Sequence, residues 1–104
     1  MFSGCSSWKE LNLKNFNSNN VVEMSYVFSD CSSLKKLNLK NLNTINVTKM
    51  EHMFFRCSSL IKLNLNNFNT INVTRMGGMF HGCSEELIKK IRNQYNNIKI
   101  EAFY

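Results

Sequence analysis

Residues 53–78 read MFFRCSSLIKLNLNNFNTINVTRMGG, and the rest of the chain is organised as copies of this stretch. Each copy opens on a pair that ends in phenylalanine, and its fifth residue is a cysteine. The copies start 26 residues apart, at Met1, Val27, Met53 and Met79, so that they fill the 104-residue chain. Self-similarity at a fixed period of this kind is typical of proteins in which each repeat buries its apolar side chains against the next repeat.

The leucines of each copy predict a strand. Leu60, Leu63 and Leu65 form an L-x-x-L-x-L pattern in which the last two point inward and Asn64 points outward. After the polar loop of each repeat the spacing changes. Apolar residues then stand at i, i+3, i+4 and i+7, as at Met50, Met53, Phe54 and Cys57. That spacing predicts a short helix, or equally a 3-10 turn, with Thr48 and Glu51 as a capping box.

The fourth copy abandons the pattern after Cys83. Ser84 is a favoured N-cap residue, and Glu85 and Glu86 suit the first turn of a helix. An apolar stripe at helical spacing follows at Leu87, Ile88, Ile91 and Tyr95. We therefore expect an amphipathic helix of about 11 residues that covers the end of the repeats. A strand is expected after it, from the alternation of Ile98, Ile100 and Ala102.

The expected fold class is an α/β solenoid of four 26-residue coils. Parallel strands would line one face, short helices or 3-10 turns the other, and a C-terminal helix would form a cap. The chain is expected to be a single leucine-rich-repeat domain, residues 1–104, with coils at 1–26, 27–52 and 53–78 and a capping repeat at 79–104.

The four cysteines, Cys5, Cys31, Cys57 and Cys83, share one place in the repeat. A buried row of small apolar side chains is the favoured interpretation. Disulfides between neighbours remain open, because neighbouring Cα atoms would lie about 5 Å apart. Zinc is disfavoured, because four ligands in a line cannot converge on a tetrahedral ion.

No arrangement of residues in the sequence points to catalysis. The two histidines, His52 and His81, belong to no common motif, and both are expected at the surface. The carboxylates form no pair, and a glycine-rich phosphate loop is absent from the sequence. We expect a protein that is not an enzyme and that uses neither a cofactor nor a metal ion.

The net charge of +6 is compatible with an acidic partner, although it also serves solubility alone. The candidate partner-binding residues on the strand face are Lys9, Asn12, Lys14, Lys35, Lys36, Asn38, Lys40, Lys62 and Asn64. Their ammonium and amide groups would bind a protein or a glycan. Nucleic acid is disfavoured, because no aromatic residues interleave with these lysines. No apolar run approaches the length of a membrane span.

The first coil has no expected cover. Its candidate self-association residues are Phe2, Trp8, Leu11, Leu13, Phe16 and Val22. An apolar end of this kind would be covered by a second copy of the chain or by further repeats. Self-assembly through this end is the alternative to ligand binding on the strand face.

The motif M-F-x-x-C-S-S-L-x-x-L-N-L-x-N-F-N-T-x-N-V-T-x-M resembles the BspA-like leucine-rich-repeat family over about residues 1–84. The resemblance implies a surface protein with an adhesin-like function. The chain departs from that family in two respects. Asparagine stands where the family usually has aspartate, as at Asn38 and Asn64, and no secretory signal is visible. The cellular location is therefore left open.

Overall fold

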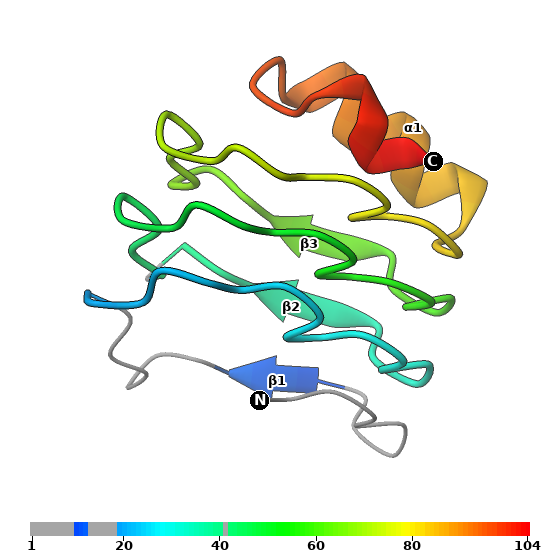
Figure 1. Ribbon diagram of the computed structural model, residues 1–104. Coiled ribbons are helices and arrows are strands. Elements are labelled where there is room, and N and C mark those ends of the chain that lie inside the picture. The colour runs from blue at the N-terminus through cyan, green and yellow to red at the C-terminus, as the bar shows by residue number, and fades with distance from the viewer. Residues whose placement is uncertain (1–9, 13–18, 41) are drawn as a thin grey trace.

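The computed structural model describes residues 10–12, 19–40 and 42–104 (Figure 1). The elements in chain order are β1 (Glu10–Asn12), β2 (Lys36–Asn38), β3 (Lys62–Asn64), the α-helix α1 (Glu85–Gln94) and the 3-10 helix η1 (Ile100–Phe103). The molecule measures 30 × 29 × 20 Å. The strands lie on one side, turn segments lie opposite them, and α1 packs at the end beyond β3.

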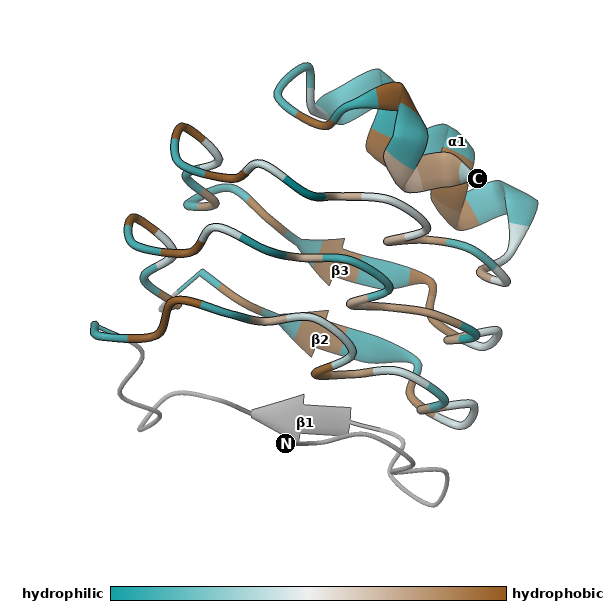
Figure 2. Cartoon of the chain, in the orientation of Figure 1, coloured by the Kyte–Doolittle hydropathy of each residue, from teal (hydrophilic) through white to brown (hydrophobic). Residues whose placement is uncertain are grey.

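The three strands form a parallel sheet in the order β1-β2-β3. Leu11 pairs with Leu37 and Leu37 with Leu63, so that the register is one full repeat. In β2, Leu37 is buried between the exposed Lys36 and Asn38, as the alternation of a strand requires. In Figure 2 the arrows of β2 and β3 accordingly show both hydrophilic and hydrophobic residues. The expected position of these strands is confirmed.

The helix or 3-10 turn expected opposite the strands is wrong. Backbone N–H groups at alternate positions donate to carbonyls of the following repeat, as from His52 to Gly77 at 3.1 Å and from Phe54 to Met79 at 2.8 Å. His52 and Arg56 have positive φ angles of 55° and 60°. Helices of either kind require negative φ, and an α-helix bonds each N–H within its own segment. The segment is a series of turns that place the same residues inward.

The capping box expected before this segment is also wrong, because there is no helix to cap. The Thr48 hydroxyl donates instead to the carbonyl of Val22 in the preceding repeat, at 3.4 Å.

The expected solenoid of four coils is wrong as well. The described residues form a small compact body with short parallel strands, turns and a single α-helix. Residues 84–104 form α1 and η1 in place of another strand and turn segment. The physical reason is that this stretch lacks the L-x-x-L-x-L pattern that defines the strands. The strand expected around Ile100 is also wrong, because Ile100–Phe103 is a 3-10 helix.

The helix expected after Ser84 is confirmed. The Ser84 hydroxyl accepts a hydrogen bond from the N–H of Leu87 at 3.1 Å, and Leu87 and Ile91 are buried. The N-cap satisfies a backbone donor that the first turn leaves unpaired.

The C-terminal segment accepts backbone donors from the residues that precede α1. The N–H groups of Gly78 and Phe80 donate to Glu101 and Ala102, at 3.0 and 2.7 Å. The Tyr95 hydroxyl accepts the N–H of Leu65 at 3.1 Å. One repeat earlier, the equivalent N–H of Leu39 donates to a strand carbonyl. Tyr95 therefore takes the place of a further strand.

A row of phenylalanine rings runs through the core. Phe28 packs parallel to Phe54, Phe54 to Phe80, and Phe80 to Phe103, with centroid distances of 5.7, 5.3 and 5.5 Å. The last ring comes from η1 and lies outside the 26-residue spacing. The first three rings are fully buried, so that their burial contributes strongly to stability.

Gly78 and Gly77 provide a matched test of the turn geometry. Gly78 has a φ of +64°, and a Cβ there would lie 2.6 Å from His52 Nε2, whereas a Cβ on Gly77 would meet nothing within 4 Å. Gly78→Ala should lower the free energy of unfolding by about 1–3 kcal/mol, and Gly77→Ala should change it by less than about 1 kcal/mol. Urea unfolding measures both, and equal effects would contradict the turn geometry.

Tyr95 provides a second test. Tyr95→Phe should cost about 1–2 kcal/mol of stability, because the N–H of Leu65 loses its acceptor. Tyr104→Phe removes the same group from a side chain that is 73% exposed, and should be close to neutral. Urea unfolding of the two variants compares them directly, and a neutral Tyr95→Phe would show that water replaces the hydroxyl without loss.

Candidate binding site on the strand face

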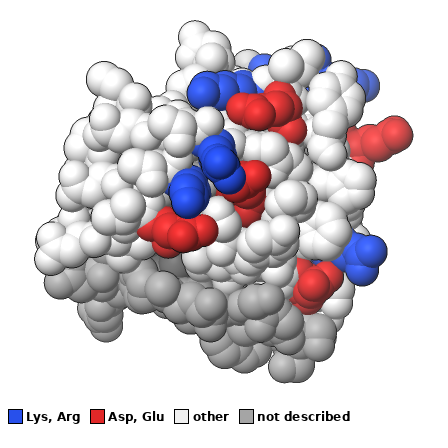
Figure 3. All heavy atoms as spheres, viewed as in Figure 1, with Lys and Arg blue, Asp and Glu red and all other residues white. Residues whose placement is uncertain are grey.

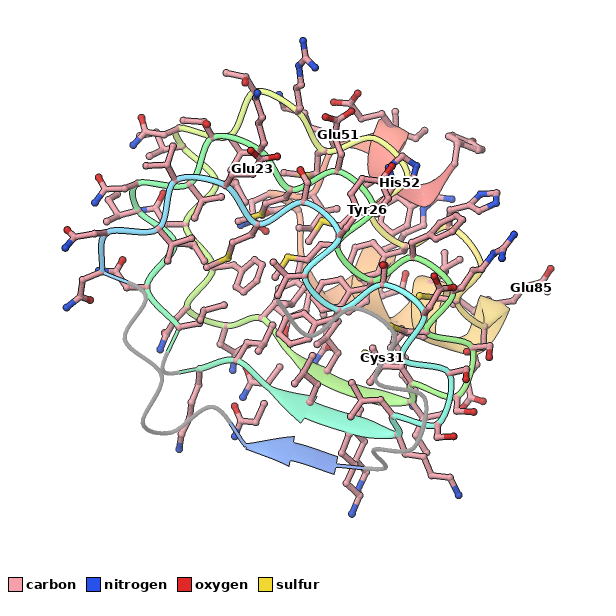
Figure 4. The ribbon with its side chains drawn as sticks, turned by 60° about the horizontal axis from the view of Figure 1, so that its bottom comes forward. Glu23, Tyr26, Cys31, Glu51, His52 and Glu85 are labelled. Atoms are coloured by element: carbon pink, nitrogen blue, oxygen red, sulfur yellow. The ribbon has the colours of Figure 1, made fainter. Side chains whose placement is uncertain are left out.

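The strand face carries lysines in adjacent rows. The register places Lys36 beside Lys62, and Lys35 and Lys40 flank them. All four side chains are exposed. Neighbouring strands lie about 4.8 Å apart, so that the Lys36 and Lys62 side chains start from adjacent positions of the sheet. Figure 4 shows side chains that end in nitrogen beyond the strands.

These lysines have no ion pair in the described part of the chain. The two ion pairs found there join Arg75 to Glu51 at 3.8 Å and Lys90 to Glu86 at 3.6 Å, both away from the strands. Figure 3 views the turn side, where positive and negative side chains are interspersed. The strand face therefore differs in charge from the turn face.

The row of the sheet that contains Lys36 and Lys62 also contains an acidic residue. Glu10 of β1 pairs in register with Lys36, although only its backbone is described. Like charges directly opposite each other destabilise a sheet, and the neighbouring Lys36 and Lys62 form such a pair.

The asparagines of this face use their oxygens within the fold. Asn38 Oδ1 accepts the N–H of Lys40 at 3.0 Å, and Asn64 Oδ1 accepts the N–H of Asn66 at 2.9 Å. Asn66 Oδ1 in turn accepts the Tyr95 hydroxyl at 3.1 Å. The first two contacts form turns that end the strands. What these amides present outward is their N–H donors.

The structure thus brings together six of the predicted partner-binding residues: Lys35, Lys36, Asn38, Lys40, Lys62 and Asn64. Lys9 and Lys14 lie outside the described residues, and of Asn12 only the backbone in β1 is described. We use "strand face" for the six described residues. Their role in binding stays a prediction.

The N-terminal residues can be followed only in part. Phe2, Trp8, Leu13 and Phe16 lie outside the described residues. The backbone of Leu11 pairs in β1, and Val22 is 54% exposed. Self-association through this end also stays a prediction.

Other asparagines connect neighbouring loops. Asn43 donates to the side chain of Asn19 at 3.3 Å, and Asn72 donates to the carbonyl of Ile45 at 2.6 Å. Their amide groups hold adjacent loops together.

Cys31, Cys57 and Cys83 form no disulfide with one another. Cys57 donates from Sγ to the Phe28 carbonyl at 3.0 Å, and Cys83 donates to the Phe54 carbonyl at 3.1 Å. Burial raises the pKa of both, to about 12 for Cys83. A thiol that stays protonated is a poor nucleophile, so these cysteines have a structural role.

An aromatic row on the turn side was missed by the sequence analysis. Tyr26 packs parallel to His52 at 4.9 Å, Phe55 lies edge-on to His52 at 5.3 Å, and Phe55 packs parallel to His81 at 5.4 Å. The expected surface position holds for His81, which is exposed, whereas His52 is half-buried. The available signal was that Tyr26 and His52 occupy the same place in successive repeats.

In the described ranges, no group of three or more His, Cys, Asp or Glu side chains is arranged to hold a metal ion. The α-helix found there is also too short and too polar to cross a bilayer.

Comparison with protein families finds a match to the one described as "Mycoplasma protein of unknown function, DUF285", over residues 1–102. Searches of curated proteins and of solved structures give no match.

The raised thiol pKa values predict a loss of stability at high pH. Below pH 9 the Cys83 thiol is protonated in both the folded and the unfolded chain, whereas between about pH 9 and about pH 12 only the unfolded chain releases the proton. The free energy of unfolding should therefore fall across this window. Urea unfolding at pH 8 and pH 11 should show a smaller fall for Cys83→Ala than for the unchanged chain, and equal falls would contradict the assignment.

Proposed function

We propose that this chain, which belongs to the DUF285 family, is a non-catalytic interaction module that binds a protein or a glycan through its strand face. The resemblance of its repeat to the BspA-like family supports an adhesin-like function of the same kind.

The single observation that carries the proposal is the side-by-side placement of Lys36 and Lys62. Both side chains are exposed, and no described carboxylate pairs with either. The repulsion between Lys36 and Lys62 costs stability when nothing is bound, and Glu10 of β1 is in register with Lys36 but not with Lys62. An acidic group on a partner would relieve the repulsion and gain from both charges.

The strand face is also held in a fixed shape before a partner arrives. Leu37, Leu39 and Leu65 are buried directly beneath it, each at most 2% exposed. The asparagine turns fix the chain where β2 and β3 end. A preformed surface loses little conformational entropy on binding, and this favours affinity.

The chemistry of the reactive side chains supports binding over catalysis. The Cys57 and Cys83 thiols donate to backbone carbonyls and are stabilised in the protonated form. A nucleophile would need a base in hydrogen-bonding reach, and these contacts provide none.

Self-association is the second candidate. Thr48 and Thr74 donate their hydroxyls to the preceding repeat, whereas the equivalent residue Val22 is apolar and 54% exposed. An exposed apolar side chain at that place fits contact with a second copy. Light scattering across a concentration series tests this candidate, and a monomer at every concentration would eliminate it.

Charge reversal tests binding by the strand face. Lys36→Glu with Lys62→Glu should weaken binding to acidic peptides or acidic glycans by about tenfold or more, because attraction becomes repulsion. Lys89→Glu with Lys99→Glu makes the same change in net charge at exposed positions of the C-terminal segment. Biolayer interferometry at fixed salt measures the affinities, and equal losses in both variants would show non-specific charge attraction.

A further inference from the structure

We infer that the ligand of the strand face is a linear polyanionic glycan that carries sulfate or carboxylate groups. The inference rests on the proposed function and narrows it. It is carried by the balance of hydrogen-bond donors and acceptors on the six described residues of this face.

The side chains of the strand face offer donors almost exclusively. A lysine ammonium has three donors and no acceptor. One lone pair of each amide oxygen of Asn38 and Asn64 is used by the backbone N–H of Lys40 or Asn66, whereas the N–H donors of these amides bond to no described residue. The amide oxygen of the adjacent Asn66 is occupied by Tyr95.

Main-chain acceptors beside these side chains are used as well. The Lys35 carbonyl accepts the N–H groups of Ile61 and Lys62, at 3.0 and 3.1 Å. The Lys40 carbonyl accepts the amide of Asn67. A ligand therefore meets N–H donors and positive charge at the side chains. The carbonyls of Lys35 and Lys40 already accept hydrogen bonds from the protein.

This balance selects among ligands. A neutral sugar presents hydroxyls, each with one O–H donor and two acceptor lone pairs, and its donors would find few acceptors on this face. Sulfate and carboxylate oxygens only accept, and their charge opposes that of the lysines. A polyanionic glycan therefore matches the face in both charge and hydrogen bonding.

Other polyanions match less well. An extended acidic peptide places carboxylates of one face about 6.7 Å apart, whereas the lysine rows follow strands about 4.8 Å apart. Single-stranded nucleic acid relies on aromatic side chains for stacking. The aromatic row that contains Tyr26 and His52 lies on the side away from the strands (Figure 4).

Asparagine-to-aspartate substitutions remove the N–H donors of the side chain while keeping the oxygen that the turn uses. Asn38→Asp keeps the oxygen that ends β2 but replaces the outward N–H donors with a second acceptor and a negative charge. Asn69→Asp makes the same chemical change at an exposed asparagine whose oxygen caps a loop turn at Ile71, 3.0 Å away. The two variants are matched in charge and in turn chemistry.

The test measures binding of the full chain to heparin, to chemically desulfated and neutralised heparin, to poly-glutamate and to a single-stranded DNA. We expect heparin to bind most tightly and the neutralised glycan to bind at least about tenfold more weakly. Asn38→Asp should weaken heparin binding about tenfold, and Asn69→Asp should leave it unchanged. Circular dichroism and urea unfolding check that both variants keep the fold.

Two kinds of failure are distinguishable. Equal binding of the neutralised glycan, tighter binding of peptide or DNA, or equal effects of the two aspartate variants would overturn the glycan inference. Each would leave the interaction module standing if Lys36→Glu with Lys62→Glu still abolished binding. If that double variant bound every probe as the unchanged chain does, both the inference and the proposed function would fall.

Discussion

Hydrogen bonds between successive repeats hold this chain together, in addition to the short-range turn bonds within each repeat. Opposite the sheet, alternate N–H groups such as those of His52 and Phe54 donate to carbonyls of the next repeat. The left-handed backbone at His52 and Arg56 is what allows the chain to turn while these donors stay aligned. The row of phenylalanines follows from this register, because it places equivalent rings of neighbouring repeats in contact, and the same register brings the Cys57 thiol to the carbonyl of Phe28.

The strands and α1 were predictable from the sequence because each has a local cause. Alternating leucines define β3, and Ser84 with the apolar stripe defines α1. The turn segments were not predictable in the same way. Their apolar spacing imitates a helix, and the left-handed positions carry ordinary side chains in the first repeats. Among the described residues, glycines mark such positions only at Gly78, near the end of the third repeat, and at Gly82, in the fourth.

The candidate site was predictable in its residues but not in its chemistry. Outward lysines follow from the strand alternation alone. The use of the amide oxygens of Asn38 and Asn64 in turns depends on backbone geometry after each strand, which residue type does not specify. The contribution of Phe103 was also hidden, because it lies 23 residues after Phe80 and so breaks the period that revealed the other rings.

The contacts of the C-terminal segment have an evolutionary consequence. Gly78, Phe80 and Leu65 present to Tyr95 and η1 the same backbone donors that each earlier repeat presents to its successor. The gain or loss of one whole 26-residue unit by gene duplication or recombination would leave that junction chemically unchanged. Related chains can therefore differ in length by multiples of this unit while keeping one terminal segment, and the area of the basic surface would grow or shrink in the same steps.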